Sequence, residues 1–299
     1  MKIAFSTVAC PDWTLERVMS FADDAEYQGV ELRTFGWSCT DFACDPALTD
    51  STKVRRLAIE SGTHVMCLGT SLRFDAPVWP PVMGRAMPGH DRNLEDAKRF
   101  IALANDMECP HLRVFGFDSP KGEKRSRTVA RVVERLQELL AVASKHRVTL
   151  ALENGGAFSH AAQVAEVLDE CDSPWLGAAY NITVGARDGD HVEEAIDLLG
   201  ERLVTVKLKD MQGTQPVEIG HGEMPLERGV KHLARLDYPG WLVVEWMKHW
   251  RPELAEPEGV LRRALETVET WVLEAGCGSG ACCNSGASTD AAAPAAAGA

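Results

Sequence analysis

Four polar side chains that could carry chemistry stand near the carboxyl ends of four apolar runs. Glu153 ends "VTLALE", Asn181 ends "LGAAYN", Lys207 lies within "LVTVKLKD" and Glu245 ends "WLVVE". Paired carboxylates can move protons as acid and base, and their oxygens can also hold a cation. Because lysine is almost never fully buried unless it is paired, we expect Lys207 to pair with Glu153 and Glu245.

The alternation of side chains along a strand predicts that these four residues point the same way. In "LVTVKLKD", the valines and leucines that alternate with Lys207 face one side and Lys207 faces the other. The same reasoning places Glu153, Asn181 and Glu245 on the inner face of their strands. Charged residues at strand ends are also commonly ordinary ion pairs or solvated groups, and this alternative stays open for each position.

Eight apolar runs alternate with stretches of helical period. The expected strands are residues 2–7, 29–33, 64–69, 111–116, 148–154, 176–181, 203–210 and 241–246. The expected helices cover residues 14–28, 51–62, 91–107, 129–140, 160–171, 191–200, 225–236 and 256–274. This order predicts parallel βαβ units closed into a (β/α)8 TIM barrel, with the chemistry at the carboxyl ends of the strands. An open doubly wound sheet is the alternative, but no Gly-x-Gly-x-x-Gly follows the first strand.

Composition limits the class of protein. The chain has 299 residues, 45% of them hydrophobic, and a formal net charge of −13, which argues against general nucleic-acid binding. No apolar run is long enough to span a membrane or to act as a signal peptide. The nine cysteines are scattered and odd in number, so a reducing cytoplasm is the simplest expectation.

Two segments fall outside the alternating pattern. Residues 72–90 form a long, proline-rich connection, which we interpret as a lid over the active face of the barrel. The expected domain covers residues 1–275, and residues 276–299 form a low-complexity tail rich in Gly, Ala, Ser and Cys. Three cysteines of the tail could bind a soft metal, although a solvated tail is the simpler reading: Cys277, Cys282 and Cys283.

Several motifs in order resemble the xylose isomerase-like TIM barrels, the sugar phosphate isomerase/epimerase superfamily that includes endonuclease IV. The matching stretches are "FSTVACPDWTLERV", "GVELR", "CLGTSLRF", "LRVFG", "LALENGG", "VKLKD", "GHGEMPLERGVKHLARLDYPGWLVVE" and "EWMKHWRPELAEPE", across roughly residues 1–272. The resemblance implies a divalent metal, Mn²⁺, Mg²⁺, Co²⁺ or Zn²⁺, held by Glu, Asp, His and Glu. It also implies proton transfer next to the carbonyl of a sugar or sugar-phosphate. The endonuclease branch needs a metal cluster whose ligand positions are depleted here.

Carried over residue by residue, the implied metal ligands are Glu153, Asn181 and Glu245, but the site departs from the family pattern. Asn181 replaces an aspartate, and Lys207 replaces a histidine. Asparagine offers a neutral carbonyl oxygen, and a protonated lysine has no lone pair and repels a cation. We therefore hypothesise that the ammonium of Lys207 takes the electrostatic place of the metal. Two further family histidines are replaced by Gly155 and Val184.

Three functions stay open at this point. The first is a metal-dependent enzyme with His221 or His249 as the available imidazoles. The second is a metal-free enzyme, with catalytic residues Glu153, Glu245 and Lys207, in which one glutamate is the base and Lys207 is an electrophile or acid. The third is a non-catalytic barrel that binds a sugar-like ligand or a partner, and a homo-oligomer is compatible with each. The candidate substrate-binding residues are Glu31, Arg33, Ser71, Arg113, Asn154, Asn181, Lys209 and Lys248.

Overall fold

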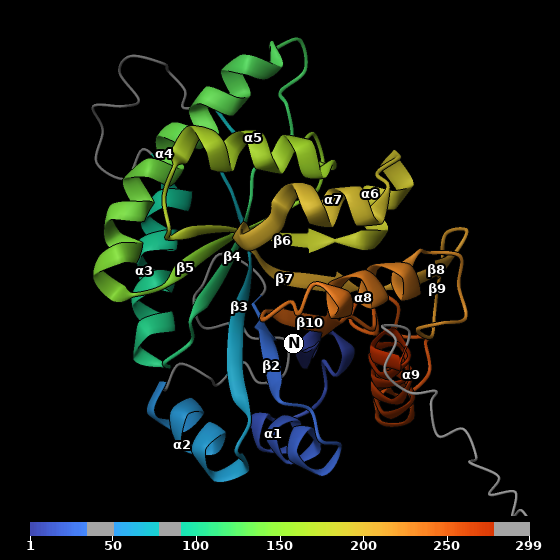
Figure 1. The fold of residues 1–299 in the computed structure, drawn as a ribbon. Helices are drawn as coiled ribbons and strands as arrows, with labels where there is room; N and C mark the ends of the chain where they lie inside the picture. Colours follow the sequence, from blue (N-terminus) through green and yellow to red (C-terminus); the bar gives the residue numbers. More distant parts are fainter. Residues whose placement is uncertain (35–50, 78–90, 278–299) are drawn as a thin grey trace, which may run out of the picture.

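The chain folds into a closed barrel of eight parallel strands, as the alternating pattern predicts. The computed structural model describes residues 1–34, 51–77 and 91–277. The strands follow the order β1-β10-β7-β6-β5-β4-β3-β2 around the barrel (Figure 1). Their bounds are β1 Lys2–Ser6, β2 Gly29–Arg33, β3 His64–Arg73, β4 His111–Phe115, β5 Thr149–Glu153, β6 Leu176–Asn181, β7 Leu203–Leu208 and β10 Trp241–Val244.

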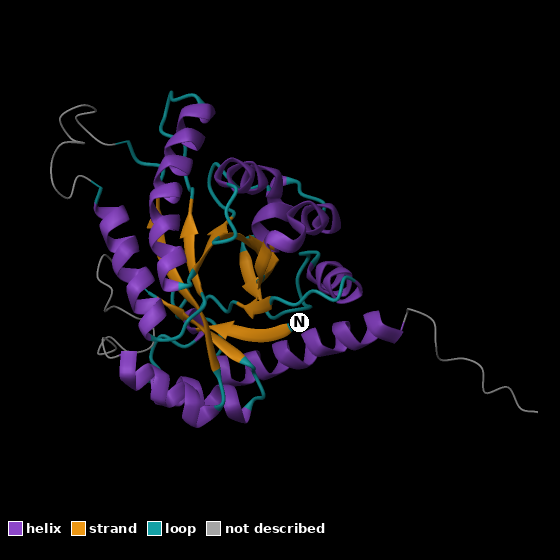
Figure 2. Ribbon diagram, turned by 60° about the vertical axis from the view of Figure 1, so that its left-hand side comes forward, coloured by secondary structure: helices purple, strands orange, loops and turns teal. Residues whose placement is uncertain are grey.

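Helices surround the strands on the outside of the barrel (Figure 2). Polar caps define where some of them begin: the side chains of Thr14 and Asp91 accept hydrogen bonds from backbone N–H groups of α1 and α3. The helices are α1 Leu15–Asp24, α2 Ser51–Ser61, α3 Arg92–Asp106, α4 Arg125–His146, α5 Ala161–Cys171, α6 Ile182–Asp188, α7 Val192–Leu199, α8 Leu226–Arg235 and α9 Pro257–Cys277. Among the described residues, short 3-10 helices lie at Thr7–Ala9 and Gly200–Arg202.

Each expected strand and helix is present, and the differences are local. β3 runs four residues further than expected, to Arg73. Helix α6 and a small antiparallel hairpin, β8 Asp210–Gln212 and β9 Gln215–Val217, were not expected. Residues 78–90 of the expected lid lie outside the described residues, and so do residues 278–299 of the expected tail, including Cys282 and Cys283.

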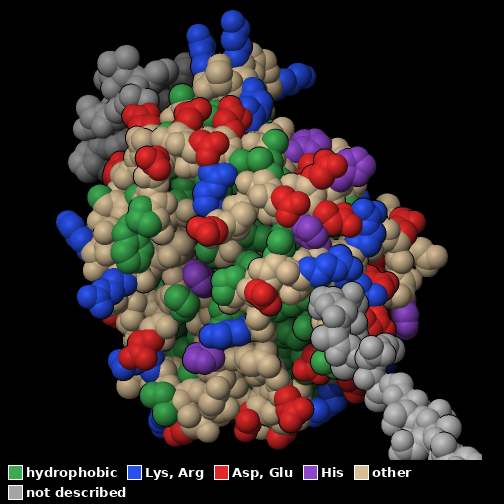
Figure 3. Space-filling view, viewed as in Figure 1, with side chains coloured by type: hydrophobic (Ala, Val, Ile, Leu, Met, Phe, Trp, Pro, Cys, Tyr) green, Lys and Arg blue, Asp and Glu red, His purple; other side chains and the backbone are tan. Residues whose placement is uncertain are grey.

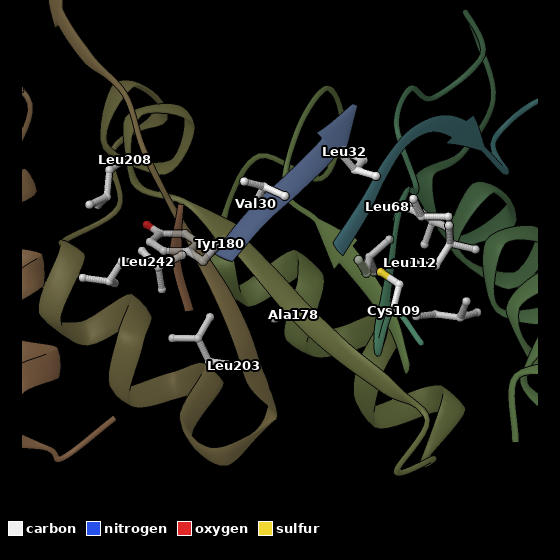
Figure 4. Packing of buried hydrophobic residues seen from close by; sticks show 14 of the residues in the cluster. Val30, Leu32, Leu68, Cys109, Leu112, Ala178, Tyr180, Leu203, Leu208 and Leu242 are labelled. Atoms are coloured by element: carbon white, nitrogen blue, oxygen red, sulfur yellow. The ribbon is translucent and has the colours of Figure 1, made fainter. Parts of the chain in front are cut away.

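The barrel has an apolar layer on its outside and a mixed interior. Outward-facing side chains such as Val30, Leu68, Leu112 and Leu242 pack in one large cluster with the helices (Figure 4). Fully burying such a side chain contributes about 1.5–3 kcal/mol, so this layer dominates the stability of the fold. The lower interior is filled by a second apolar cluster of Ala4, Met66, Cys67, Trp241 and Val243.

The strand register brings the polar inner residues to one level. Asn181 on β6 pairs with Lys207 on β7, which pairs with Val243 on β10, two residues before Glu245. On the neighbouring strand β5, Glu153 pairs with Ala179 of β6, two residues before Asn181. All four polar residues are therefore buried above the second apolar cluster: Glu153, Asn181, Lys207 and Glu245.

The surface charges, the helices and the cysteines of the described residues do not point to a specific function. Acidic and basic side chains are interspersed over the face shown in Figure 3. No helix among the described residues is long and apolar enough to cross a membrane. Among the described residues, Cys10 is buried, and Cys67, Cys109 and Cys171 are buried free thiols.

Candidate active site

A buried ammonium lies at the centre of the upper barrel. The Lys207 side chain is 1% exposed, and its Nζ donates to a carboxylate oxygen of Glu31 and, at 3.3 Å, to Oε1 of Glu245. The partnership with Glu245 agrees with the sequence-based expectation. The expected partnership with Glu153 is wrong, because Glu31 takes that place across the barrel from Lys207.

Glu153 is instead bound by a guanidinium from the neighbouring strand. Arg113 on β4 approaches Oε2 of Glu153 at 3.0 Å and lies 3.9 Å from Oε1 of Glu245. It also donates to the backbone carbonyl of Thr70 at 2.8 Å. The side-chain amide of Asn181 donates to Oε1 of Glu153 at 3.4 Å. Arg113 therefore links the Glu153 carboxylate to the pair formed by Lys207 and Glu245.

Glu31 and Arg33 end β2 but are not bonded to each other. Glu31 accepts a hydrogen bond from Ser6 Oγ at 2.7 Å in addition to that from Lys207. Arg33 donates to the carbonyls of Thr34 and Gly69 and to Ser71 Oγ at 3.0 Å. A Cβ at position 69 would lie 2.9 Å from the Glu31 carboxyl carbon, so glycine there makes room for the buried carboxylate.

The buried charged side chains form a network of Glu31, Arg33, Arg113, Glu153, Lys207 and Glu245. Attraction within this network shifts the pKa values of Glu31, Glu245 and Lys207. Burial by itself would raise the pKa of Glu31 and Glu245, but the cations Lys207 and Arg113 outweigh it and lower both, Glu245 to about 2 with help from Lys209. Burial would lower the pKa of Lys207, but Glu31 and Glu245 raise it. Lys207 is thus a fixed ammonium between ionised carboxylates at neutral pH.

The two arginines of the network respond differently to their surroundings. Burial lowers the pKa of Arg113, yet attraction to Glu153, Glu31 and Glu245 raises it overall. For Arg33, burial and repulsion by Arg113 lower the pKa to about 9. Both guanidiniums therefore stay charged at neutral pH.

A cavity of about 570 Å³ opens above the network at the carboxyl ends of the strands. It brings together seven of the residues predicted from sequence. Glu31, Lys207 and Arg113 do not line it and lie in the buried network instead. The lining residues are Arg33, Ser71, Arg73, Phe115, Phe117, Glu153, Asn154, Gly155, Gly156, Asn181, Val184, Lys209, Glu245, Met247 and Trp250.

Lys248 lies apart from the cavity lining. Its ammonium donates to the carbonyls of Pro252 and Leu254 at 2.8 and 2.5 Å and to Glu256 at 3.0 Å. It therefore fixes the loop that leads into α9. Asn154, by contrast, lines the cavity and donates through its amide to the carbonyl of Ser159 at 2.9 Å.

Sequence reasoning missed part of the apolar wall of the cavity. Phe115 ends β4, and Phe117 lies two residues further along in "VFGF"; Met247 follows Trp246. Phe117 has a positive φ of 85°, which is uncommon for a residue other than glycine. The alternation of aromatic residues in "FGF" is the signal that could have indicated this wall.

The donor set does not fit the divalent metal that the resemblance implies. The Lys207 ammonium already bridges the carboxylates of Glu31 and Glu245, and it would repel a cation placed beside it. The side-chain oxygen of Asn181 accepts from the backbone N–H of Val184 at 3.3 Å, and its amide faces Glu153. Over the described ranges, no group of three or more His, Cys, Asp or Glu side chains could hold a metal ion, with His221 and His249 included in that search.

Comparisons with known proteins agree with the fold. The family model described as "Xylose isomerase-like TIM barrel" matches residues 19–271. L-ribulose-5-phosphate 3-epimerase UlaE of Shigella flexneri is 26% identical over 267 residues, which cover 82% of this chain and 88% of that protein.

Two solved structures give the same picture. An L-ribulose 3-epimerase superposes with a TM-score of 0.77 at 16% identity, over 93% of this chain and 96% of that one. An IOLI protein with a bound zinc atom superposes with a TM-score of 0.72 at 17% identity, over 92% of this chain and 99% of that one. At these identities the two structures support the fold alone.

Proposed function

The chain belongs to the xylose isomerase-like TIM barrel family, and on that premise we propose that it is a sugar or sugar-phosphate epimerase or isomerase that transfers a proton next to a carbonyl. The observation that carries this proposal is the shared cavity of Glu153 and Glu245, two buried carboxylates on different strands at the carboxyl ends of the barrel. Similar proteins named as ribulose and ribulose-5-phosphate epimerases make these ketoses the first substrates to test.

In this proposal, Glu153 removes the proton from the carbon next to the carbonyl. The C–H bond breaks, its electron pair forms an enediolate, and the negative charge moves to the carbonyl oxygen. Cations that line the cavity, Arg33 among them, stabilise that charge. Return of the proton from protonated Glu153 to the neighbouring carbon on the same face gives isomerisation. Epimerisation requires a proton on the opposite face of the same carbon, which solvent water supplies while Glu153 releases its proton to solvent.

Glu245 and Lys207 have supporting roles in the same scheme. Because the pKa of Glu245 is held at about 2 against the burial that would raise it, Glu245 stays ionised and accepts hydrogen bonds from substrate hydroxyl groups. Lys207 holds Glu245 in place and supplies the positive charge that a metal supplies in the family. Its burial and raised pKa, caused by Glu31 and Glu245 against desolvation, argue against an imine.

Solvent deuterium exchange tests this proposal. Ribulose and its 5-phosphate are incubated with the protein in D₂O, and NMR follows loss of the proton next to the carbonyl together with new sugar signals. We expect exchange by the wild type and a loss of about 10²-fold or more in Glu153→Gln, the size typical for a missing acid/base group. Glu170→Gln, on an exposed site of α5, is the matched control and keeps full exchange. Equal exchange in Glu153→Gln and the wild type contradicts the assigned role.

A second candidate function is ligand binding without turnover. The observation that favours it is that Asn181 and Lys207 stand where the resemblance implies metal ligands, and the Lys207 ammonium is already held by Glu31 and Glu245. Calorimetric binding of a ketose with no deuterium exchange over the same panel would support this second function over the first.

A further inference from the structure

Six charged side chains at the floor of the cavity and in the buried layer beneath it balance in charge. The three carboxylates are Glu31, Glu153 and Glu245, and three cations act on them: Lys207, Arg113 and Arg33. These six groups therefore contribute no net charge to the floor of the cavity.

One cation of the cavity wall lies outside this balance. Lys209 follows β7, lines the cavity and is half-buried. In the part of the chain that the structure describes, its ammonium makes no hydrogen bond or ion pair, while its backbone carbonyl accepts from Thr183. Its charge reaches Glu245, whose pKa is lowered by Lys207 first and then by Lys209, against the effect of burial.

The third cation of the cavity wall is already neutralised. The guanidinium of Arg73 makes two hydrogen bonds to the carboxylate of Asp75, at 2.8 and 2.7 Å, and lies 3.8 Å from Asp118. Arg33 is held by two backbone carbonyls and Ser71. Among the described residues that line the cavity, Lys209 is thus the cation whose charge no hydrogen bond or ion pair offsets, in a protein whose net charge is −13.

We propose that the substrate carries an anionic group, a phosphate monoester or a carboxylate, that binds the ammonium of Lys209. This inference rests on the proposed function and deepens it by naming the substrate class. The polar floor at Glu153 and Asn181 takes the hydroxyl-bearing carbons, and the anionic end lies on the β7 side of the cavity. A hydrogen bond between charged partners contributes more than one between neutral groups, so Lys209 discriminates between charged and neutral sugars.

Calorimetry with the full chain tests the inference, with ribulose, ribulose 5-phosphate and ribonate as probes. We expect at least one of the anionic probes to bind about 10- to 100-fold more tightly than ribulose, the range for a charged hydrogen bond. The probe with the larger gain identifies phosphate or carboxylate as the group that is bound. Lys209→Met lowers this ratio to near one, Lys209→Arg keeps most of it, and the control Lys145→Met, exposed on α4, leaves it unchanged.

The outcomes separate this inference from the proposed function. Equal affinity for the neutral and both anionic probes, or an unchanged ratio in a folded Lys209→Met variant, overturns the anionic subsite even if deuterium exchange is observed. A ratio that depends on Lys209 supports the subsite even if no probe exchanges its proton, in which case the epimerase proposal fails alone. Thermal unfolding of each variant shows whether it is folded.

Discussion

At the scale of single residues, the central feature is a buried ammonium that would be unstable alone. Removing a charged group from water costs several kcal/mol even after relaxation, and the pairs with Glu31 and Glu245 must offset that cost for Lys207. Each member of the network is therefore held in its charged form by the others. Removing one member leaves an uncompensated charge in a dry environment.

This dependence predicts the result of a double-mutant cycle. Lys207→Met is expected to lower the free energy of unfolding by about 3–5 kcal/mol at neutral pH, because Glu31 and Glu245 lose their shared partner. Adding Glu31→Gln removes one stranded charge, so the double variant loses less than the sum of the two single losses. Urea denaturation measures all four proteins. Losses that simply add would show that Lys207 and Glu31 do not interact.

The network also predicts how stability depends on pH. Lys207, Lys209 and Arg113 lower the pKa of Glu245 from 4.5 to about 2 against desolvation, so its contribution is complete above 4.5 and is lost as the pH falls towards 2. We expect the free energy of unfolding to fall between about pH 5 and pH 2 in the wild type, and to fall less steeply in Glu245→Gln. Parallel curves for the two proteins would rule out this role of Glu245, and Glu170→Gln serves as the control that should follow the wild type.

The sequence could predict that Lys207 needs carboxylate partners, but only partly which ones. The requirement follows from the cost of a buried ammonium, and Glu245 directly follows β10, the strand next to β7. Glu31 is 176 positions away in the chain and on the far side of β1 and β10, so no local pattern points to it. The ion pair of Glu153 with Arg113 likewise depends on the conformation of the long Arg113 side chain, and the alternation of side chains along a strand does not specify that conformation.

At the scale of elements, the loop after β7 is organised by one carboxylate. The buried Asp210 accepts hydrogen bonds from the backbone N–H groups of Met211, Gly220, Gly222 and Met224, at 2.9 to 3.3 Å. These bonds fold the β8–β9 hairpin and the segment after it back against the end of β7. Since Lys209 directly precedes Asp210, the same bonds stabilise the position of Lys209 at the cavity.

The Asp210→Asn variant therefore tests the loop after β7 rather than a catalytic group. The amide keeps one acceptor oxygen and places donors against backbone donors, so we expect a loss of about 2–3 kcal/mol in unfolding free energy. Hydrogen exchange should rise at the amides of residues 211–224 and change little elsewhere. Asp106→Asn, exposed at the end of α3, provides the control. Unchanged exchange in this segment would show that Asp210 does not organise the loop.

The repeating elements were predictable and the irregular ones were not. Strands and helices of the barrel follow from apolar period, which the burial of one face imposes over many residues. The β8–β9 hairpin has three-residue strands around Gly213, and α6 has seven residues. Such short elements bury too little apolar surface to leave a periodic signal, and they depend on contacts such as those of Asp210.

At the scale of the whole molecule, closure of the barrel is what assembles the site. Residues from β2, β4, β5 and β7 meet at one level only because β1 joins β2 to β10. Leu72 and Arg73 of the expected lid belong to β3, and residues 276–277 of the expected tail belong to α9. The lid and the tail beyond these residues, homo-oligomerisation and a cytoplasmic location stay predictions. At this scale, our hypothesis is that the ammonium of Lys207 takes the electrostatic place of the metal that the resemblance implies, in a catalytically active site.

Deuterium exchange by chelator-treated protein is the most direct test of this role of Lys207. The purified protein is treated with EDTA, its metal content is measured, and deuterium exchange into the ketose panel is followed with and without added Mn²⁺, Mg²⁺, Co²⁺ or Zn²⁺. A parallel sample carries Lys207→His with Asn181→Asp, which restores the family's ligand types. We expect exchange by the metal-free wild type that added metal does not increase, and metal binding only in the double variant. Exchange that disappears with EDTA and returns with a divalent ion in the wild type would contradict the hypothesis.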